Sequence, residues 1–225
     1  MNNDARLEAK VEKMAQWLWQ ARARRLPYRN LPDELRPASI AEAYAAQEAY
    51  YRLAEPSLGA VAGAKIATTT KVMQQLMGIT HPCGGAIFSR TIHHSPAKLH
   101  AGDFVNLRIE SEIALKLSAD LPAAGAPWTR AAVAPAITPK PVRVDDLVGI
   151  AGRLMLGGKL VGEGAAEGPC ATLVWLANHV AARGRDLKAG MVVITGSLIT
   201  TVSIAAGRRA VFTVDGLGET VMDVV

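Results

Sequence analysis

The sequence predicts an α+β chain in which a helical N-terminal region precedes a β-rich domain. Residues 4–25 carry apolar side chains every three or four positions, as an amphipathic helix does. Residues 107–117 instead alternate between apolar and polar side chains, which is the period of a half-buried strand. We therefore expect the helical region at residues 1–57 and the β-rich domain at residues 58–225.

The composition is that of an ordinary globular protein. Of the 225 residues, 50% are apolar and 20% are charged. The net charge is +5, but the basic residues are scattered, and their densest cluster, residues 22–25, ends the first helix, where it complements the helix dipole. The sequence has few aromatic residues and no stripe of Lys or Arg interleaved with them, so we expect no nucleic-acid partner.

The sequence also predicts where the protein works. The start is polar and does not resemble a signal peptide, and no apolar run reaches the roughly 18 residues of a membrane span. Cys83 and Cys170 are far apart and form no CxxC motif, which suits a reducing compartment. We expect a cytoplasmic protein without a membrane partner.

Two helices beyond the first have clear end signals. Ser39 and Glu42 form a capping box before a helix over residues 40–53, which should end ahead of Pro56. Pro169 is predicted to open a later helix that Gly184 closes. Between them, residues 147–156 and 159–161 read as a β-hairpin.

Lys65 is the one charge inside a run of small apolar residues, positions 59–67. It is either an edge-strand residue whose ammonium reaches water or a partly buried ammonium. A buried lysine has a lowered pKa, and it can move a proton or hold a carboxylate. Both interpretations stay open on the residues alone.

Glu110 and Glu112 fall on the polar face of the 107–117 strand, roughly 6.5–7 Å apart along it. Two carboxylates that close repel each other unless a positive charge lies between them. A hard divalent cation with oxygen ligands, Mg²⁺ or Mn²⁺, would meet that need. The alternative is a solvated face in which Arg108 and Lys116 balance the two acids.

Thr195-Gly196-Ser197 ends a continuous apolar strand that begins at Met191. Its backbone N–H and hydroxyl groups could bind a carboxylate. The alternative is a plain turn between two strands.

Read together, these segments resemble the 2-keto-4-pentenoate hydratase, or hydratase-decarboxylase, branch of the fumarylacetoacetate hydrolase superfamily. The resemblance runs in order from about residue 7 to the end of the chain. The segments that carry it are Gly63-Ala64-Lys65-Ile66, Met73-Gln74-Gln75, Arg108-Ile109-Glu110-Ser111-Glu112-Ile113-Ala114, Gly162-Glu163-Gly164, Val174-Trp175-Leu176-Ala177-Asn178, Leu187-Lys188-Ala189-Gly190, Val193-Ile194-Thr195-Gly196-Ser197 and Gly216-Leu217-Gly218.

The resemblance implies a β-rich roll or sandwich barrel with outer helices and a helical N-terminal region. It also implies a divalent cation held by Glu110, Glu112 and a third carboxylate, with Lys65 as the acid/base group. Thr195, Gly196 and Ser197 would face the substrate.

The chain departs from the family pattern at two places. In relatives the third acidic ligand follows a Pro-Ala-apolar mark, whereas here Thr138 follows Ile137, and the acidic, aromatic stretch that comes next in relatives is missing. Relatives also carry an acidic residue where Cys83 stands. The alternative sources of a third ligand are Asp145, Asp146 and Glu163.

The implied function is a hydro-lyase that hydrates 2-hydroxypenta-2,4-dienoate to 4-hydroxy-2-oxopentanoate in aromatic-compound catabolism. Decarboxylation of a 2-oxo-enedioate and hydrolysis of an acylpyruvate C–C bond would use the divalent cation in the same way. Both reactions stay open as alternatives. A catalytically silent partner subunit is the alternative of another class. The expected partners are a small 2-oxo acid, further copies of the chain in a homo-oligomer, and a decarboxylase-type subunit.

Overall fold

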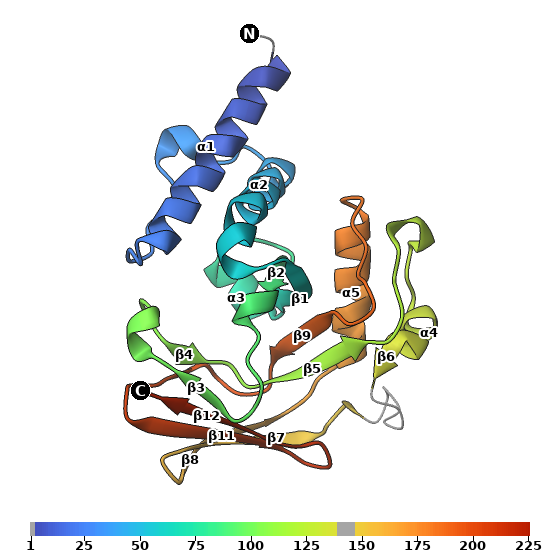
Figure 1. The fold of residues 1–225 in the computed structure, drawn as a ribbon. Helices are drawn as coiled ribbons and strands as arrows, with labels where there is room; N and C mark the ends of the chain where they lie inside the picture. Colours follow the sequence, from blue (N-terminus) through green and yellow to red (C-terminus); the bar gives the residue numbers. More distant parts are fainter. Residues whose placement is uncertain (1–2, 139–146) are drawn as a thin grey trace. The chain divides into compact units, whose positions relative to one another are not determined.

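The computed structural model describes residues 3–138 and 147–225, and it mixes helices with sheets (Figure 1). Contacts within the chain divide it into two compact units. We call them the helical unit (Met1–Val61, Phe88–Thr91 and Gly102–Asn106) and the sheet unit (Ala62–Ile87, Ile92–Ala101 and Leu107–Val225). The predicted division at residues 57 and 58 stays a prediction, because a contact cluster is not a test of independent folding.

The helical unit is built on α1 (Asn3–Ala23) and α2 (Ile40–Leu58), which pack side by side (Figure 1). A short 3₁₀ turn, η1 (Asp33–Leu35), lies in the loop that joins them. The predicted capping box is confirmed, because Ser39 Oγ accepts from the Glu42 N–H at 3.1 Å. Glu42 Oε2 accepts from the Ala38 N–H at 2.7 Å and completes the cap. The buried contact between the helices consists of Val11, Met14, Ala15, Ala46 and Ala49.

The prediction that the second helix ends before Pro56 is wrong, since α2 continues through Pro56 to Leu58. Proline removes one N–H from the helix, and here it stands close enough to the end that little is lost. The helix ends at Gly59, whose φ of 82° suits glycine and whose N–H bonds the Glu55 carbonyl. Arg90 adds donors to the last carbonyls, those of Pro56 and Ser57.

The sheet unit contains two open five-stranded sheets that lie in two layers (Figure 1). In the first, β9 runs parallel to β1 and antiparallel to β5. In the second, β11 lies between β12 and β7 and is antiparallel to both. The first sheet has the order β2 (Cys83–Phe88), β1 (Val61–Ala67), β9 (Val192–Ser197), β5 (Glu112–Leu117), β6 (Ile137–Thr138). The second has the order β3 (Ala97–Leu99), β12 (Gly218–Val224), β11 (Arg208–Val214), β7 (Ala151–Leu156), β8 (Lys159–Ala165).

Helix α5 (Pro169–Ala181) covers the first sheet beside β9 (Figure 1). Its buried side chains join those of β5 and β9 in one core, in which Leu117, Leu173, Leu176 and Val193 are at most 1% exposed. The predicted α+β class and the fumarylacetoacetate-hydrolase-like fold are confirmed, with sheets that stay open rather than closing into a barrel.

The predicted strand over residues 107–117 exists as two pieces. Its alternation is confirmed, because Ser111, Ile113, Leu115 and Leu117 are buried. However, β4 (Arg108–Ile109) pairs with β10 (Val202–Ser203), whereas β5 pairs with β9. The break falls at residues 110–111, where the chain changes partner, so the two glutamates lie at this junction and not inside one regular strand.

The remaining helices are short. Thr70 Oγ1 caps α3 (Lys71–Leu76) by accepting from the Met73 N–H. The apolar stretch before residue 137 is helical, as α4 (Arg130–Val133) followed by η5 (Ala134–Ala136). Further single-turn 3₁₀ segments are η2 (Ser89–Thr91), η3 (Ala101–Asp103) and η4 (Ala123–Gly125).

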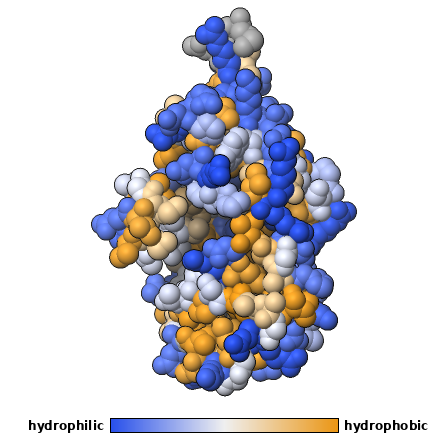
Figure 2. All heavy atoms as spheres, turned by 90° about the vertical axis from the view of Figure 1, so that its left-hand side faces the viewer, coloured by the Kyte–Doolittle hydropathy of each residue, from blue (hydrophilic) through white to orange (hydrophobic). Residues whose placement is uncertain are grey.

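In the described part of the chain, no helix is long and apolar enough to cross a membrane. On the face drawn in Figure 2, apolar side chains reach the surface in separate groups between hydrophilic ones. Four of the exposed apolar residues belong to α3 or directly follow it: Val72, Met73, Leu76 and Met77.

Candidate metal centre and active site

Glu112 opens β5, and its carboxylate is the most perturbed acid of the described residues. Burial raises the pKa of this carboxyl from 4.5 to about 7. The Gly196 N–H, which donates to Oε2, opposes that rise, the neighbouring Glu110 carboxylate adds to it, and the Lys65 ammonium opposes it. Glu110, two residues away, and Lys65, from the distant strand β1, therefore both act electrostatically on Glu112.

Glu110 lies in the junction between β4 and β5 and is exposed. Thr201, which directly precedes β10, donates its hydroxyl to Glu110 Oε1 at 3.3 Å. This contact joins residues 91 positions apart, and nothing in the spacing of the sequence indicates it. Thr201 is thus a contact of the candidate site that sequence reasoning missed.

Lys65 is exposed, although β1 lies between β2 and β9 and is not an edge strand. The expectation of an edge strand is therefore wrong, while the exposure of Lys65 agrees with an ammonium that reaches water. On β2, Gly85 lies beside the lysine stem, and a Cβ there would be in ordinary van der Waals contact with Lys65 Cγ and Cε at 3.6 Å. The ammonium is accordingly free to act on Glu112, as the effect on that carboxyl's pKa indicates.

The predicted turn at Thr195-Gly196-Ser197 is instead the last part of β9, where Ser197 pairs with Glu112. Ser197 Oγ accepts from the Ser111 N–H at 3.1 Å and donates to the Ile199 carbonyl at 2.7 Å. Thr195 Oγ1 donates to the Ile113 carbonyl at 2.8 Å. These bonds fix the two segments against each other, so Gly196 holds its N–H on the Glu112 carboxylate.

Glycines explain why backbones approach so closely around this site. A Cβ on Gly63 would lie 2.1 Å from the Val192 carbonyl oxygen, and one on Gly164 would lie 1.8 Å from that of Leu198. Real Cβ atoms do not come that near, so only glycine fits. The first contact seats β1 on β9, and the second lets the chain after β9 pass over β8.

The donor set fits a hard divalent cation through two carboxylates. Such a cation would offset both the burial of Glu112 and the repulsion from Glu110, and Mg²⁺ keeps several water ligands in most sites. Within residues 3–138 and 147–225, no group of three or more His, Cys, Asp or Glu side chains is arranged to hold a metal. A third protein ligand is therefore not found in the described part of the chain.

Of the three candidates for that third ligand, the structure describes only Glu163. Asp145 and Asp146 lie outside the described residues, as does the side chain of Thr138. Glu163 lies on the face of β8 opposite to Gly162 and Gly164, paired across the ladder with Arg153. Its charge helps to raise the pKa of Arg153, after the larger effect of Asp215. The structure therefore does not bring Glu163 to the carboxylate pair.

Two further residues of α5 have structural roles. Asn178 accepts from the Trp128 N–H at 2.7 Å and donates to the Trp128 carbonyl at 2.9 Å, so it ties the loop before α4 to α5. His179 stacks on Trp175 with ring centroids 4.4 Å apart. Burial, together with the charges of Arg183 and His81, lowers the pKa of His179 to about 4. Because the His179 ring is neutral and stacked on Trp175, we assign it a role in packing.

Comparison with known proteins adds to this geometry. No family model matches the chain. It is 27% identical to a 2-hydroxyhexa-2,4-dienoate hydratase of Comamonas testosteroni, over 92% of this chain and 95% of that protein. It is also 27% identical to a 2-keto-4-pentenoate hydratase of Dechloromonas aromatica, over 84% of this chain and 87% of that protein. The predicted resemblance to this hydratase branch is confirmed.

Among solved structures, the chain is similar to 4-oxalocrotonate decarboxylase from Pseudomonas putida G7, complexed with magnesium and adipate. The TM-score is 0.86 at 19% identity, with 96% of this chain and 98% of that chain covered. The chain has the fold of the fumarylacetoacetate hydrolase superfamily. The prediction of a hydratase-type enzyme agrees with the names of both relatives.

Proposed function

We propose that the chain is a divalent-metal-dependent hydro-lyase that hydrates 2-hydroxypenta-2,4-dienoate, or a close analogue, to the 4-hydroxy-2-oxo acid. The observation that carries this proposal is the Glu112 carboxylate, which burial and Glu110 destabilise and which Lys65 and the Gly196 N–H stabilise. The names of the two hydratases support the substrate class and a place in aromatic-compound catabolism.

Glu110 and Glu112 would hold Mg²⁺ or Mn²⁺ through their carboxylates. A bound cation would supply Lewis-acid polarisation of the 2-oxo oxygen and a partner for the 1-carboxylate. The magnesium of the decarboxylase neighbour supports this choice. The Gly196 N–H donates to Glu112 and the Thr201 hydroxyl donates to Glu110. These bonds would orient the two carboxylates, as outer hydrogen bonds do in metal sites.

Lys65 is the proposed acid/base residue. As the dienol becomes a 2-oxo-3-enoate, the 2-hydroxyl loses a proton and C5 gains one. The Lys65 ammonium would transfer this proton. Water then adds its oxygen at C4 and a proton at C3, which completes the hydration. The end of β9, Thr195-Gly196-Ser197, would lie along the substrate, with Gly196 next to Glu112.

The test is the ultraviolet decay of 2-hydroxypenta-2,4-dienoate with purified protein and Mg²⁺ or Mn²⁺, repeated with chelator. We expect metal-dependent loss of the diene absorbance and formation of 4-hydroxy-2-oxopentanoate. Lys65→Ala, or Glu110→Ala together with Glu112→Ala, should abolish the decay. Unchanged turnover in those variants would contradict the assignment.

A second candidate is a catalytically silent partner subunit, because the described residues hold no third carboxylate beside Glu110 and Glu112. Such a subunit should retain no stoichiometric Mg²⁺ or Mn²⁺ after gel filtration and should not consume the dienoate. Metal analysis of the purified protein separates the two candidates without an activity assay.

We further propose that the protein forms a homo-oligomer. The exposed apolar side chains of the α3 segment, among them Val72 (72% exposed) and Leu76 (75% exposed), support this, because a contiguous apolar patch favours association. Sedimentation velocity of Leu76→Glu against the unchanged protein tests it, and an unaltered mass distribution would contradict a role for this helix.

A further inference from the structure

A cavity of about 270 Å³ adjoins the carboxylate pair in the sheet unit. It is lined by the end of β9, by residues 165–169 between β8 and α5, by the first turn of α5 and by Thr69. Its volume is below the range of roughly 300–1,000 Å³ typical of drug-sized ligands, so it suits a small acid.

Gly196 connects this cavity to the candidate metal centre. Its N–H donates to Glu112, and the same residue lines the cavity wall. Lys65, Glu110 and Glu112 themselves do not line it. Because Gly196 touches both, the cavity is the neighbouring space for the other end of a substrate whose 2-oxo acid group lies at the carboxylate pair.

Three of the four hydroxyl-bearing side chains that line the cavity are already used as donors. Thr195 donates to the Ile113 carbonyl, Thr172 to the Thr195 carbonyl at 3.1 Å, and Ser197 to the Ile199 carbonyl. Each hydroxyl has a single hydrogen to donate. These three side chains consequently offer no hydrogen-bond donor to a carboxylate in the cavity.

The charge of the wall is negative. Glu167 is exposed, and it is the one ionisable side chain among the described residues that line the cavity. The helix end there is a weak source of positive potential, because Pro169 has no N–H and Glu167 stands directly before the N-cap Gly168. A second substrate carboxylate would meet a like charge and no basic side chain.

We infer that this cavity binds the uncharged end of a monocarboxylic 2-hydroxy-2,4-dienoate, and that Glu167 excludes dicarboxylic analogues. This inference rests on the proposed function and deepens it, because it favours hydration of a monoacid over decarboxylation of a 2-oxo-enedioate. Glu167 is then a specificity-determining residue at the far end of the substrate.

The experiment compares kcat/KM for 2-hydroxypenta-2,4-dienoate and for 2-hydroxyhexa-2,4-dienedioate in the unchanged protein, Glu167→Gln and Glu167→Lys. Glu163→Lys is the matched control, since it makes the same charge change on an exposed glutamate that faces Arg153. We expect the unchanged protein to prefer the monoacid at least about tenfold. Each unit of charge change at Glu167 should shift the ratio toward the diacid by about five- to tenfold, given Coulomb energies near a surface.

Binding of saturated analogues separates failure of this inference from failure of the proposed function. Calorimetry with 2-oxopentanoate and 2-oxohexanedioate in the presence of Mg²⁺ measures the same discrimination without turnover. If neither dienoate is consumed but Glu167→Lys still shifts the binding ratio, the function fails and the cavity assignment stands. Equal affinity of the unchanged protein for both acids, or equal shifts for Glu167→Lys and Glu163→Lys, overturns the inference.

Discussion

The two ends of the β5–β9 strand pair carry acidic residues in opposite electrostatic states. At one end, Glu112 pairs with Ser197, and burial raises the pKa of its carboxyl to about 7. At the other end, Asp120 and Asp186 are exposed or nearly so, and both have pKa values below the usual range.

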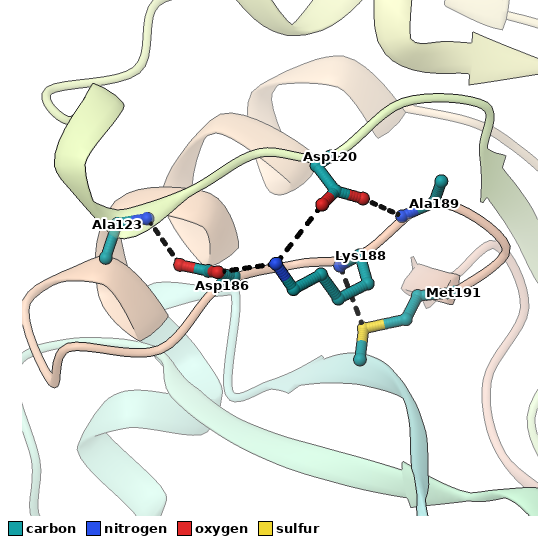
Figure 3. A network of polar contacts seen from close by, with 6 residues as sticks. All are labelled: Asp120, Ala123, Asp186, Lys188, Ala189 and Met191. Carbon is teal, nitrogen blue, oxygen red and sulfur yellow. Dashed lines mark hydrogen bonds and ion pairs between the residues drawn. The ribbon is translucent and has the colours of Figure 1, made fainter.

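Backbone N–H groups and one lysine account for the low pKa values at the second end: the Ala189 N–H has the largest effect on Asp120, and Lys188 has the largest effect on Asp186. Lys188 Nζ lies 3.1 Å from Asp120 Oδ2 and 2.7 Å from Asp186 Oδ2, between the two carboxylates (Figure 3). Their remaining oxygens accept from the backbone N–H groups of Ala189 and Ala123, each at 2.8 Å. We call these five residues the lysine bridge. Every carboxylate oxygen in it has a donor, so it links two loops and needs no further ion.

The difference contrasts a structural acid pair with a candidate functional pair. In the lysine bridge the positive charge is part of the chain. At the Glu110–Glu112 end, the Lys65 ammonium lowers the pKa of Glu112 only slightly, and burial outweighs it. A site left in this state is suited to a cation from solution.

The largest expected effect comes from Glu112→Gln. Removing a metal carboxylate should lower kcat/KM at least about 10³-fold, since a bound cation contributes several kcal/mol to the transition state. The unfolding temperature should stay the same or rise, because a buried charge is removed. Steady-state kinetics measures kcat/KM, and calorimetry measures the unfolding temperature. A variant that keeps a tenth of the activity would contradict a metal-binding role for Glu112.

The two lysines provide a matched pair of variants. Lys65→Met should lower turnover about 10²–10⁴-fold, the range for loss of a general acid or base, and leave the unfolding temperature nearly unchanged. Lys188→Met should keep full turnover and lower the unfolding midpoint by no more than about 2–3 °C, because exposed ion pairs contribute little. The reverse pattern would assign chemistry to the lysine bridge.

Thr201→Val tests the hydrogen bond that the Thr201 hydroxyl donates to Glu110. Loss of an outer hydrogen bond typically weakens metal binding about 10–100-fold, and Thr201→Ser should restore it because the hydroxyl is retained. Mg²⁺ affinity of the metal-free protein, measured by titration calorimetry, is the readout. An equal loss in the Ser variant would point to packing of the Thr methyl group instead.

The smallest expected effect is a pH dependence of opposite sign at the two ends, measured on metal-free protein. Glu112 has a raised pKa in the folded state, so its contribution favours folding below 4.5 and is lost as the pH rises toward about 7. Asp120 and Asp186 have lowered pKa values, so their contribution is present above 3.8 and is lost as the pH falls below it.

Unfolding temperature against pH, measured for the unchanged protein, Glu112→Gln and Asp120→Asn, separates the two contributions. Glu112→Gln should lack the gain in stability between pH 7 and 4.5, and Asp120→Asn should lose less below pH 4 than the unchanged protein. Parallel curves for all three proteins would contradict the contrast between the ends.

Local patterns in the sequence predicted most elements of the fold. The cap at Ser39, the hairpin at residues 157–158 and the helix from Pro169 depend on neighbouring residues, so they can be read from the sequence. Pro56 misled the prediction because its effect depends on distance from the helix end. The split of the 107–117 strand depends on β9 and β10, about 90 residues away, and the sequence does not reveal which strand pairs with which segment.

The candidate site divides in the same way. Glu110 and Glu112 follow from strand periodicity and Lys65 from its apolar surroundings. Thr201 and Glu167 do not, since each matters only through a contact or a cavity wall formed by distant segments. The assignment of Thr195-Gly196-Ser197 to a turn failed because pairing with Glu112 extends β9 to Ser197.

The double hydrogen bond between Asn178 and the Trp128 backbone has a consequence for chain length. It fixes the segment before residue 139 to α5, and Ile137 and Leu147 are both buried in the same core, at 7% and 5% exposure. The frame is thus secured on each side of residues 139–146, so connections of different length can be exchanged there while the strands keep their register.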